Sequence, residues 1–374
     1  MMDSFYAWLL LPLGMALGWA LARGRRAGTP ADTLANLNSL ASDNGEQAIA
    51  ALSRAAAAEP GTVELQLTLG GLFRKRGEID RAIRIHEAVL TRTSMNPVEA
   101  AAVRLELAQD YLKAGLLDRA EALLRELESS GQQLAPALEL QLDLHEQGHD
   151  WHQAIETARR LQAVRGSSVG PRIAQYWCEL AEAARLKGEA PAAAEAAGKA
   201  LEQDPECVRA SLIQAALAEA EKEWRTAIKT YWRAMQQDGR YFTEVASKIE
   251  HCYREAGQAG EYSKFLDEAE AALAQSAAPA LAKARWLQAQ GQDPRAYVGE
   301  HLAQKPTREG LLLWLSASGA AEPGVKAVGE GLQKALQTQP RYSCTACGLR
   351  PSVLFWQCPN CKKWGSIVPV EERL

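Results

Sequence analysis

Apolar residues recur with helical spacing through most of the chain. Between about Pro30 and Gln339 they fall at i, i+3 and i+4, the spacing that places side chains on one face of an α-helix. One such segment contains Leu105, Ala108 and Leu112. The composition is 47% hydrophobic but only 6% aromatic, so Ala and Leu dominate, which favours helix over strand. The pattern predicts an all-α fold.

Short turns containing glycine interrupt this pattern at regular intervals. Successive turn glycines lie 33 to 40 residues apart, except for one interval of 69 residues that contains a turn without glycine at Lys222-Glu223-Trp224. An alanine typically follows about five positions after such a turn, where paired helices must approach closely. This period resembles the tetratricopeptide repeat, so we expect a solenoid of helix pairs whose groove binds other proteins. The turn glycines are Gly77, Gly115, Gly148, Gly188, Gly257 and Gly291, and the alanines are Ala82, Ala120, Ala154, Ala193 and Ala227.

An uncharged stretch runs from Ser4 to Ala22, near the N-terminus. As a helix it would span about 28 Å, close to the hydrocarbon core of one bilayer. Asp3 precedes it and basic residues follow it, so the positive-inside rule places the N-terminus outside and the remaining chain in the cytoplasm. We therefore expect a single-pass transmembrane anchor, with its basic collar, within residues 1–26. The membrane-orienting residues are Arg23, Arg25 and Arg26.

Two glycines in the anchor, Gly14 and Gly18, are spaced four residues apart. This spacing forms a face of small residues on which another transmembrane helix can pack. It indicates helix packing in the membrane, with a homo-oligomer as one outcome.

The C-terminal tail contains two Cys-x-x-Cys pairs. Two thiolates on one tight turn can bind a single ion, and two facing turns complete a tetrahedral site that suits zinc or one iron. Because so short a segment cannot bury enough apolar surface alone, metal binding and folding should be one event. The predicted metal ligands are Cys344, Cys347, Cys358 and Cys361.

Apolar and basic residues surround these cysteines in the sequence. The apolar ones are expected to form a small core, and the cations to offset the charge of about −2 of four thiolates with a divalent ion. The cations could instead indicate nucleic-acid contact, as in some zinc ribbons. The apolar residues are Tyr342, Leu354, Phe355, Trp356, Trp364 and Ile367, and the cations are Arg341, Arg350, Lys362 and Lys363.

The overall charge argues against a protein recruited by nucleic acid, since the net charge is −4 and the pI about 6.0. The other cysteines, Cys178, Cys207 and Cys252, lie in helical pattern and are interpreted as small buried hydrophobes. A thiolate metal site together with free thiols indicates a reducing compartment. No phosphate-binding or nucleophile motif is found in the sequence, so we expect no enzyme.

Tryptophans within the repeats are interpreted as packing between helices, with the alternative that some line the groove and contact a partner. They are Trp151, Trp177, Trp224, Trp232, Trp286 and Trp314. The expected domains are the anchor in residues 1–26, the repeat array in 30–305, capping helices in 306–340 and the metal module in 341–374.

The order of anchor, repeat array and metal module is similar to that of the lipopolysaccharide assembly protein LapB family of Gram-negative bacteria. The tail carries the most specific resemblance, because Tyr342-x-Cys-x-x-Cys-Gly and Trp356-x-Cys-Pro-x-Cys-x-x-Trp364 match that family's rubredoxin-like pattern. Electron-carrying rubredoxins have more chain between the pairs, and usually glycine where Lys362 stands. This departure favours a structural or docking role over redox transfer.

The resemblance implies a non-enzymatic adaptor in the bacterial inner membrane, with a periplasmic N-terminus. Members of that family act with the membrane protease FtsH to promote turnover of LpxC, the deacetylase that commits flux to lipid A. A further membrane protein signals the lipopolysaccharide level to them through the anchor. Two alternatives stay open: a rubredoxin-type electron-transfer protein on a repeat scaffold, and a nucleic-acid-binding zinc-ribbon protein.

Overall fold

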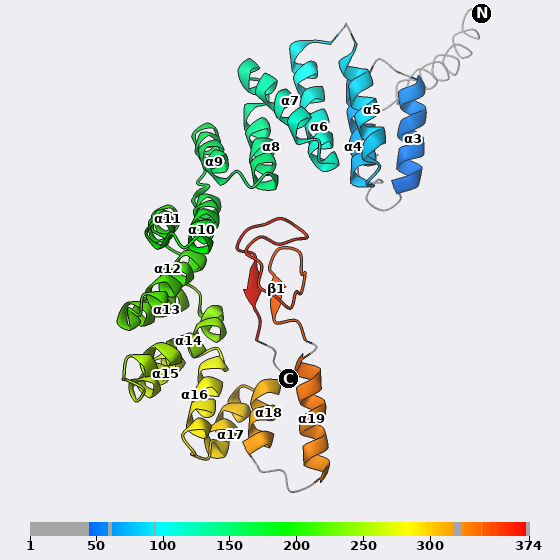
Figure 1. Ribbon diagram of the computed structural model, residues 1–374. Helices are drawn as coiled ribbons and strands as arrows, with labels where there is room; N and C mark the ends of the chain where they lie inside the picture. The colour runs from blue at the N-terminus through cyan, green and yellow to red at the C-terminus, as the bar shows by residue number, and fades with distance from the viewer. Residues whose placement is uncertain (1–44, 59–61, 93–94, 318–322, 338, 372–374) are drawn as a thin grey trace, which may run out of the picture. The chain divides into compact units, whose positions relative to one another are not determined.

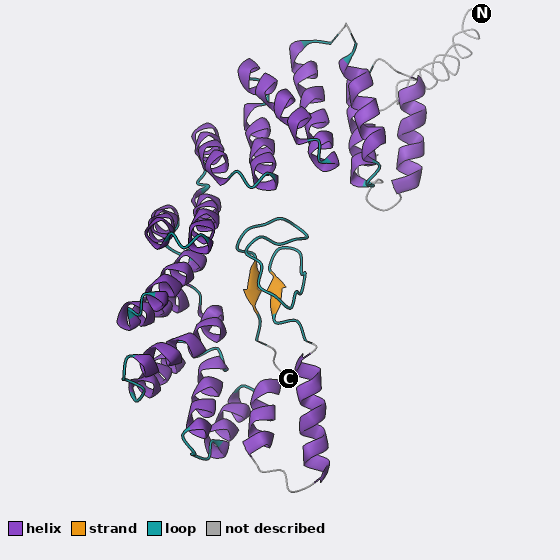
Figure 2. Cartoon of the chain, viewed as in Figure 1, coloured by secondary structure: helices purple, strands orange, loops and turns teal. Residues whose placement is uncertain are grey.

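The computed structural model describes residues 45–58, 62–92, 95–317, 323–337 and 339–371. In these ranges the chain forms helices and one small two-stranded sheet (Figures 1 and 2). Contacts within the chain divide it into two compact units, Met1–Gly148 and His149–Leu374.

The predicted transmembrane anchor lies outside the described residues. The same holds for Gly14 and Gly18 and for the collar arginines Arg23, Arg25 and Arg26. Across the ranges given above, no helix is both long and apolar enough to cross a membrane. The anchor and its orientation therefore stay predictions.

Unit 1 is a row of helices in which each helix packs against the next. One apolar core joins α3 to α5 around Leu52, Leu69 and Leu72. A second core joins α5 to α8 around Leu107 and Leu124. The helices are α3 (Gly45–Ala58), α4 (Val63–Lys75), α5 (Ile79–Leu90), α6 (Pro97–Ala114), α7 (Leu117–Ser130) and α8 (Leu134–Gln147).

Unit 2 continues the helical pattern with cores that each span successive helices. The largest joins α12 to α15 around Phe242 and Leu266. The helices are α9 (Trp151–Arg165), α10 (Gly170–Leu186), α11 (Ala190–Gln203), α12 (Val208–Ala220), α13 (Trp224–Gln237), the 3-10 turn η1 (Gly239–Tyr241), α14 (Phe242–Glu255), α15 (Glu261–Ala272), α16 (Ala278–Ala289), α17 (Arg295–Gln304), α18 (Arg308–Ala317) and α19 (Pro323–Gln337).

The predicted alanines occupy the close approaches between helices. All of them are fully buried at 0% exposure, because a larger side chain would force the paired helices apart. This confirms the solenoid prediction for the described repeats. The residues are Ala82, Ala120, Ala154, Ala193 and Ala227.

The turns between helices require left-handed backbone. Gly77, Gly188 and Gly257 have φ of 81°, 79° and 70°, values that glycine adopts without steric cost. In the predicted turn that lacks glycine, Lys222 takes a φ of 62° instead. The turn is therefore present, although a side chain makes it less favourable.

An ionic cluster is buried between α4, α5 and α6 of unit 1. The carboxylate of Asp110 is fully buried and lies 2.6 Å from His86 Nδ1 and 2.7 Å from Arg74 Nη1. Arg74 also binds Glu106 at 2.6 Å. Gly70 leaves room for the imidazole, since a Cβ there would lie 2.3 Å from His86 Nε2. The cluster ties three successive helices through charge rather than apolar contact.

The tail forms a small antiparallel ladder from β1 (Tyr342–Cys344) and β2 (Ile367–Pro369). Tyr342 pairs with Pro369, and Cys344 pairs with Ile367. An isolated bridge joins Gln357 to Trp364. The all-α prediction therefore holds for the repeats, and the tail adds this short ladder.

Candidate metal centre

Each Cys-x-x-Cys pair lies on a tight turn, and the two turns have the same hydrogen bonds. In the first, the Gly348 N–H donates to the Cys344 carbonyl at 3.0 Å, and the Cys344 N–H donates to Leu349 at 2.8 Å. In the second, the Lys362 N–H donates to the Cys358 carbonyl at 2.8 Å. The Cys358 N–H donates in turn to the Lys363 carbonyl at 3.0 Å. The two turns are thus copies of one local structure.

The residue after each pair adopts left-handed backbone. Gly348 has a φ of 74°, and Lys362 has a φ of 58°. Glycine adopts this region without steric cost, whereas a residue with a Cβ is destabilised there. The sequence departure at Lys362 therefore changes the cost of the second turn but not its shape.

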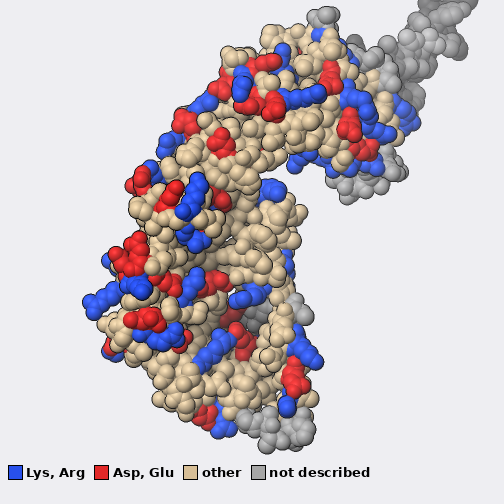
Figure 3. All heavy atoms as spheres, in the orientation of Figure 1, with Lys and Arg blue, Asp and Glu red and all other residues tan. Residues whose placement is uncertain are grey.

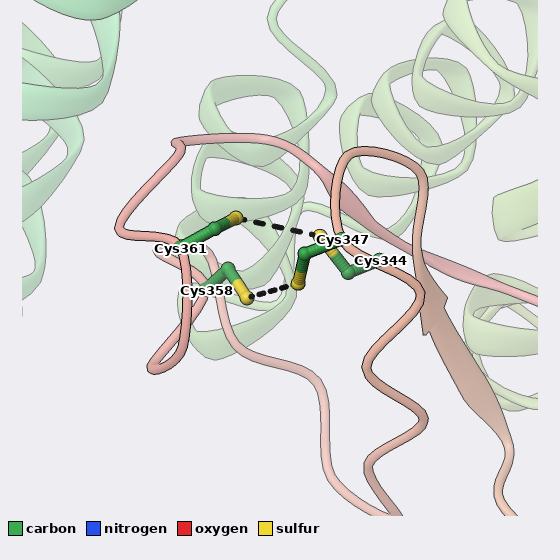
Figure 4. Close-up of side chains that lie close together, drawn as sticks. All are labelled: Cys344, Cys347, Cys358 and Cys361. Atoms are coloured by element: carbon green, nitrogen blue, oxygen red, sulfur yellow. Dashed lines mark hydrogen bonds between the residues drawn. The ribbon is translucent and has the colours of Figure 1, made fainter. Parts of the chain in front are cut away.

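The two turns bring the four predicted ligands together (Figure 4). The Sγ atoms of Cys344 and Cys361 are 3.7 Å apart, and so are those of Cys347 and Cys358. All four sulfurs lie within 4.8 Å of one another, and none forms a disulfide. A tetrahedral zinc site with Zn–S bonds of about 2.3 Å requires sulfurs about 3.8 Å apart. The donor set and its spacing fit one zinc or iron ion.

The ionisation of these thiols also fits a bound cation. A hydrogen bond with Ser366, whose Oγ lies 3.4 Å from the sulfur, helps lower the pKa of Cys344 to about 6. The backbone N–H of Leu349 and then the Asn360 side chain lower the pKa of Cys347. For Cys361 the Lys363 N–H has a lowering effect, but burial and the neighbouring thiols raise the pKa to about 11. Without a cation the sulfurs cannot all be thiolates, and a divalent ion removes that conflict.

Ser366 was not singled out by the sequence. It is buried, and its hydroxyl donates to the Lys363 carbonyl at 2.9 Å while its own carbonyl accepts from Thr345 N–H at 2.7 Å. It therefore links the strand β2 to both turns. A serine close to a cysteine only in space gives no local sequence signal.

The core of the module differs from the one expected. Tyr342, Leu354 and Ile367 pack together as predicted, joined by Cys344, Cys358, Leu349 and Cys361. The prediction was wrong for Phe355, which is 42% exposed. It was also wrong for Trp356 and Trp364, which contact helices of unit 2 instead of the module's own core.

Trp356 packs on the helices at one side of the module. Its ring stacks on Tyr241 with centroids 5.7 Å apart and planes 7° from parallel. The guanidinium of Arg209 lies 5.6 Å from the ring centroid, in cation–π geometry. Trp356 and Leu354 also pack against Val208.

Trp364 packs on a second aromatic group, formed by α9 and α10. Trp151 and Tyr176 stack with centroids 5.9 Å apart, and Trp364 meets each of them edge-on at 6.0 Å. Edge-to-face pairs are a favoured aromatic geometry. Trp151 therefore packs between α9 and α10, as interpreted from the sequence, and it also contacts the chain's own tail.

Polar contacts complete this attachment. Tyr342 donates its hydroxyl proton to Glu244 at 2.8 Å, and Tyr241 donates to the Ile367 carbonyl at 3.3 Å. The Glu371 carboxylate accepts from the Ala277 N–H at the start of α16, at 2.5 Å. We call the solenoid side of this contact the docking face. It consists of Trp151, Tyr176, Val208, Arg209, Tyr241 and Glu244.

The docking face lies on the side of the row of helices in unit 2 where Figure 1 draws the tail, and the Tyr342–Glu244 hydrogen bond places β1 beside α14. The predicted charge-offsetting cations, Arg341, Arg350, Lys362 and Lys363, are all exposed. On the face drawn in Figure 3, basic and acidic side chains are interspersed, with no continuous basic patch. This arrangement gives no support to a nucleic-acid interface on that face.

Fold and site together define a class: a tetratricopeptide-like solenoid that carries a C-terminal rubredoxin-type metal module. Residues 342–369 match the family described as "Rubredoxin metal binding domain". Over nearly its whole length, the chain resembles proteins named lipopolysaccharide assembly protein B. It is 28% identical to the one from Escherichia coli K12, with 97% of each chain covered. It is 29% identical to the one from Haemophilus influenzae, with 98% of each chain covered.

A solved structure is also similar in part. The C-terminal part of a repeat protein from Cytophaga hutchinsonii aligns at 15% identity with a TM-score of 0.46. The alignment covers 65% of this chain and 96% of that one.

Proposed function

We propose that this protein is a non-enzymatic adaptor that regulates lipopolysaccharide synthesis at the bacterial inner membrane. The observation that carries the proposal is the similarity to lipopolysaccharide assembly protein B across 97% of both chains. A helical-repeat solenoid supports it, because such stacks present long surfaces for other proteins.

In this proposal, residues 1–26 anchor the protein with its N-terminus in the periplasm, and residues 30–305 form the binding array. Residues 306–340 cap the array, and residues 341–374 hold one zinc or iron ion through the four cysteines. An anchor confines the adaptor to the membrane plane, which raises its effective concentration near a membrane protease. The proposed partners are FtsH, its substrate LpxC and a membrane protein that senses lipopolysaccharide.

The metal module supports a docking role rather than a catalytic one. Its aromatic side chains lie against the solenoid's docking face, so an ordered metal site fixes how the tail is presented there. The bound ion would supply folding energy and neutralise the thiolates. The four cysteines hold the ion, and Trp356 and Trp364 connect the folded module to the repeats.

The test is capture of partners by the full-length protein from its own membranes. Three forms are compared with the intact chain: a Cys358→Ser/Cys361→Ser variant, a form lacking residues 1–26, and Cys252→Ser as a control for loss of an unrelated thiol. We expect the intact protein and the control to capture FtsH and LpxC. Both other forms should capture much less.

The same experiment can reject the proposal. If the intact protein captures neither partner but binds a reductase or RNA, the adaptor assignment fails. The metal module would then be the active part of an electron-transfer or nucleic-acid-binding protein.

A further inference from the structure

Two cysteines outside the metal centre lie next to each other. Cys178 is in α10 and Cys207 is the residue before α12, and their Sγ atoms are 3.8 Å apart. Both are buried, as the sequence predicts. Their pairing was not foreseen, since they are far apart in sequence. The third such residue, Cys252, is buried in the core of α12 to α15.

The surroundings of this pair are more polar than a hydrophobic role requires. Gln175 donates from Nε2 to Cys207 Sγ at 3.7 Å. Arg209, only 5% exposed, forms an ion pair with Glu179 at 2.8 Å. Its Nε is buried and has no hydrogen-bond partner in the part of the chain that the structure describes. The positive charge of Arg209 favours a thiolate at Cys207, whereas the nearby Asp204 carboxylate opposes it.

The two thiols are not equivalent. A hydrogen bond from Cys178, and then one from the Ala210 backbone N–H, lower the pKa of Cys207, although burial opposes this. The same hydrogen bond and burial raise the pKa of Cys178. Cys207 also stands at the start of α12, where the helix dipole favours an anion. The geometry thus pairs one activated sulfur with a protonated neighbour.

We propose that Cys178 and Cys207 form a reversible dithiol–disulfide site that reacts with hydrogen peroxide. The Cys207 thiolate attacks a peroxide oxygen, the O–O bond breaks, and a sulfenic acid and one water form. Cys178 then attacks the sulfenic sulfur, its proton leaves with the hydroxyl as a second water, and the disulfide closes. The two thiols lose two electrons and two protons, and the peroxide is reduced to two waters.

Closing this disulfide must move the start of α12. The sulfurs have to approach from 3.8 Å to about 2.05 Å. Arg209, two residues after Cys207, lies over the Trp356 ring, and Val208 belongs to the apolar cluster on which Trp356 and Leu354 pack. Oxidation at this site therefore acts on the docking face and loosens the module.

The test uses the full-length, reduced and metal-loaded protein, titrated with hydrogen peroxide. Free thiols are then alkylated in denaturant, and the protein is digested with trypsin, which cuts at Arg185 and Lys199 between the two cysteines. Mass spectrometry identifies linked peptides, and a chromogenic chelator reports metal release. Cys178→Ala and Cys207→Ala test the pair, and Cys252→Ala is the matched control.

We expect a Cys178–Cys207 peptide that forms before metal is released and disappears with dithiothreitol. Alkylation of Cys252 should not change, and the Cys252→Ala variant should behave as the parent. The proposal is overturned if both cysteines stay open to alkylation while the metal-site thiols oxidise, or if Cys207 stops at sulfinic acid. Hydrogen exchange around Trp356 should rise in the oxidised protein, and unchanged exchange would refute the coupling to the module.

Discussion

The repeats and the metal module are stabilised by different means. In the repeats, successive helices bury continuous apolar cores, such as the one around Phe242 and Leu266. In the described part of the module, the buried apolar side chains besides the cysteines are few, chiefly Tyr342, Ile367 and Val368. So small a core cannot offset the entropy of ordering the segment. One chain thus joins a part that folds by apolar burial to a part that folds around a metal ion, and aromatic contacts connect them.

Removing the metal should produce the largest effect and should separate the two parts. A Cys358→Ser/Cys361→Ser variant, or chelation of the intact protein, should unfold residues 342–369, because a structural zinc supplies about 10–16 kcal/mol. The helical far-UV circular dichroism should barely change, whereas the near-UV signal of the docked tryptophans should be lost. Cys252→Ser serves as control. Loss of helix together with the module would show that the array also depends on the metal.

A substitution in the buried ionic cluster should destabilise the repeat array without affecting metal binding by the module. Asp110→Ala removes the buried carboxylate that binds both His86 and Arg74 and leaves their buried hydrogen-bonding groups without this partner, so we expect unit 1 to lose about 3–5 kcal/mol of unfolding free energy. Denaturant unfolding measures this loss, and metal content should stay unchanged.

A matched control for that change is Glu126→Ala, which removes the exposed pair with Arg104. We expect a cost of about 0–1 kcal/mol there. Equal effects of the two substitutions would contradict the importance of the buried cluster.

The connection between the two parts can be weakened without touching either core. Trp364→Ala removes the edge-on contacts with Trp151 and Tyr176, at a cost of about 1–3 kcal/mol. The variant should keep its metal but become more sensitive to proteolysis in the tail. Phe355→Ala, at an exposed site, should stay within about 0.5 kcal/mol of the parent. Metal loss in Trp364→Ala would mean that docking and metal binding cannot be separated.

The smallest expected effect compares the two cysteine turns. Lys362→Gly removes the steric strain of left-handed backbone, which costs a non-glycine residue about 1–2 kcal/mol. Part of this gain in stability is lost because glycine has more conformational freedom in the unfolded chain. The net gain should be below about 1 kcal/mol, seen as a higher melting temperature of the metal-loaded module. Gly348→Ala should act in the opposite direction. A destabilising Lys362→Gly would show that the lysine side chain itself supports the site.

Local patterns were enough to predict the repeats and the clustering of the four cysteines. Turn glycines and the alanines that follow them lie at fixed spacing along the chain, and each cysteine pair forms its turn within a few residues. The positions of Trp356, Trp364 and Ser366 were not predictable in this way. Each depends on a contact made in space by distant segments, as when Trp364 reaches Trp151. The Cys178–Cys207 pairing was missed for the same reason.

The central claim is that metal binding orders the tail and thereby its contact with the docking face. Hydrogen exchange on the full-length protein, with and without metal, tests this most directly. We predict that metal removal makes the backbone amides of residues 342–369 exchange rapidly and increases hydrogen exchange at the start of α12 and in η1. Hydrogen exchange in α4 to α7 should stay unchanged. A tail that keeps its protection without metal would contradict the account.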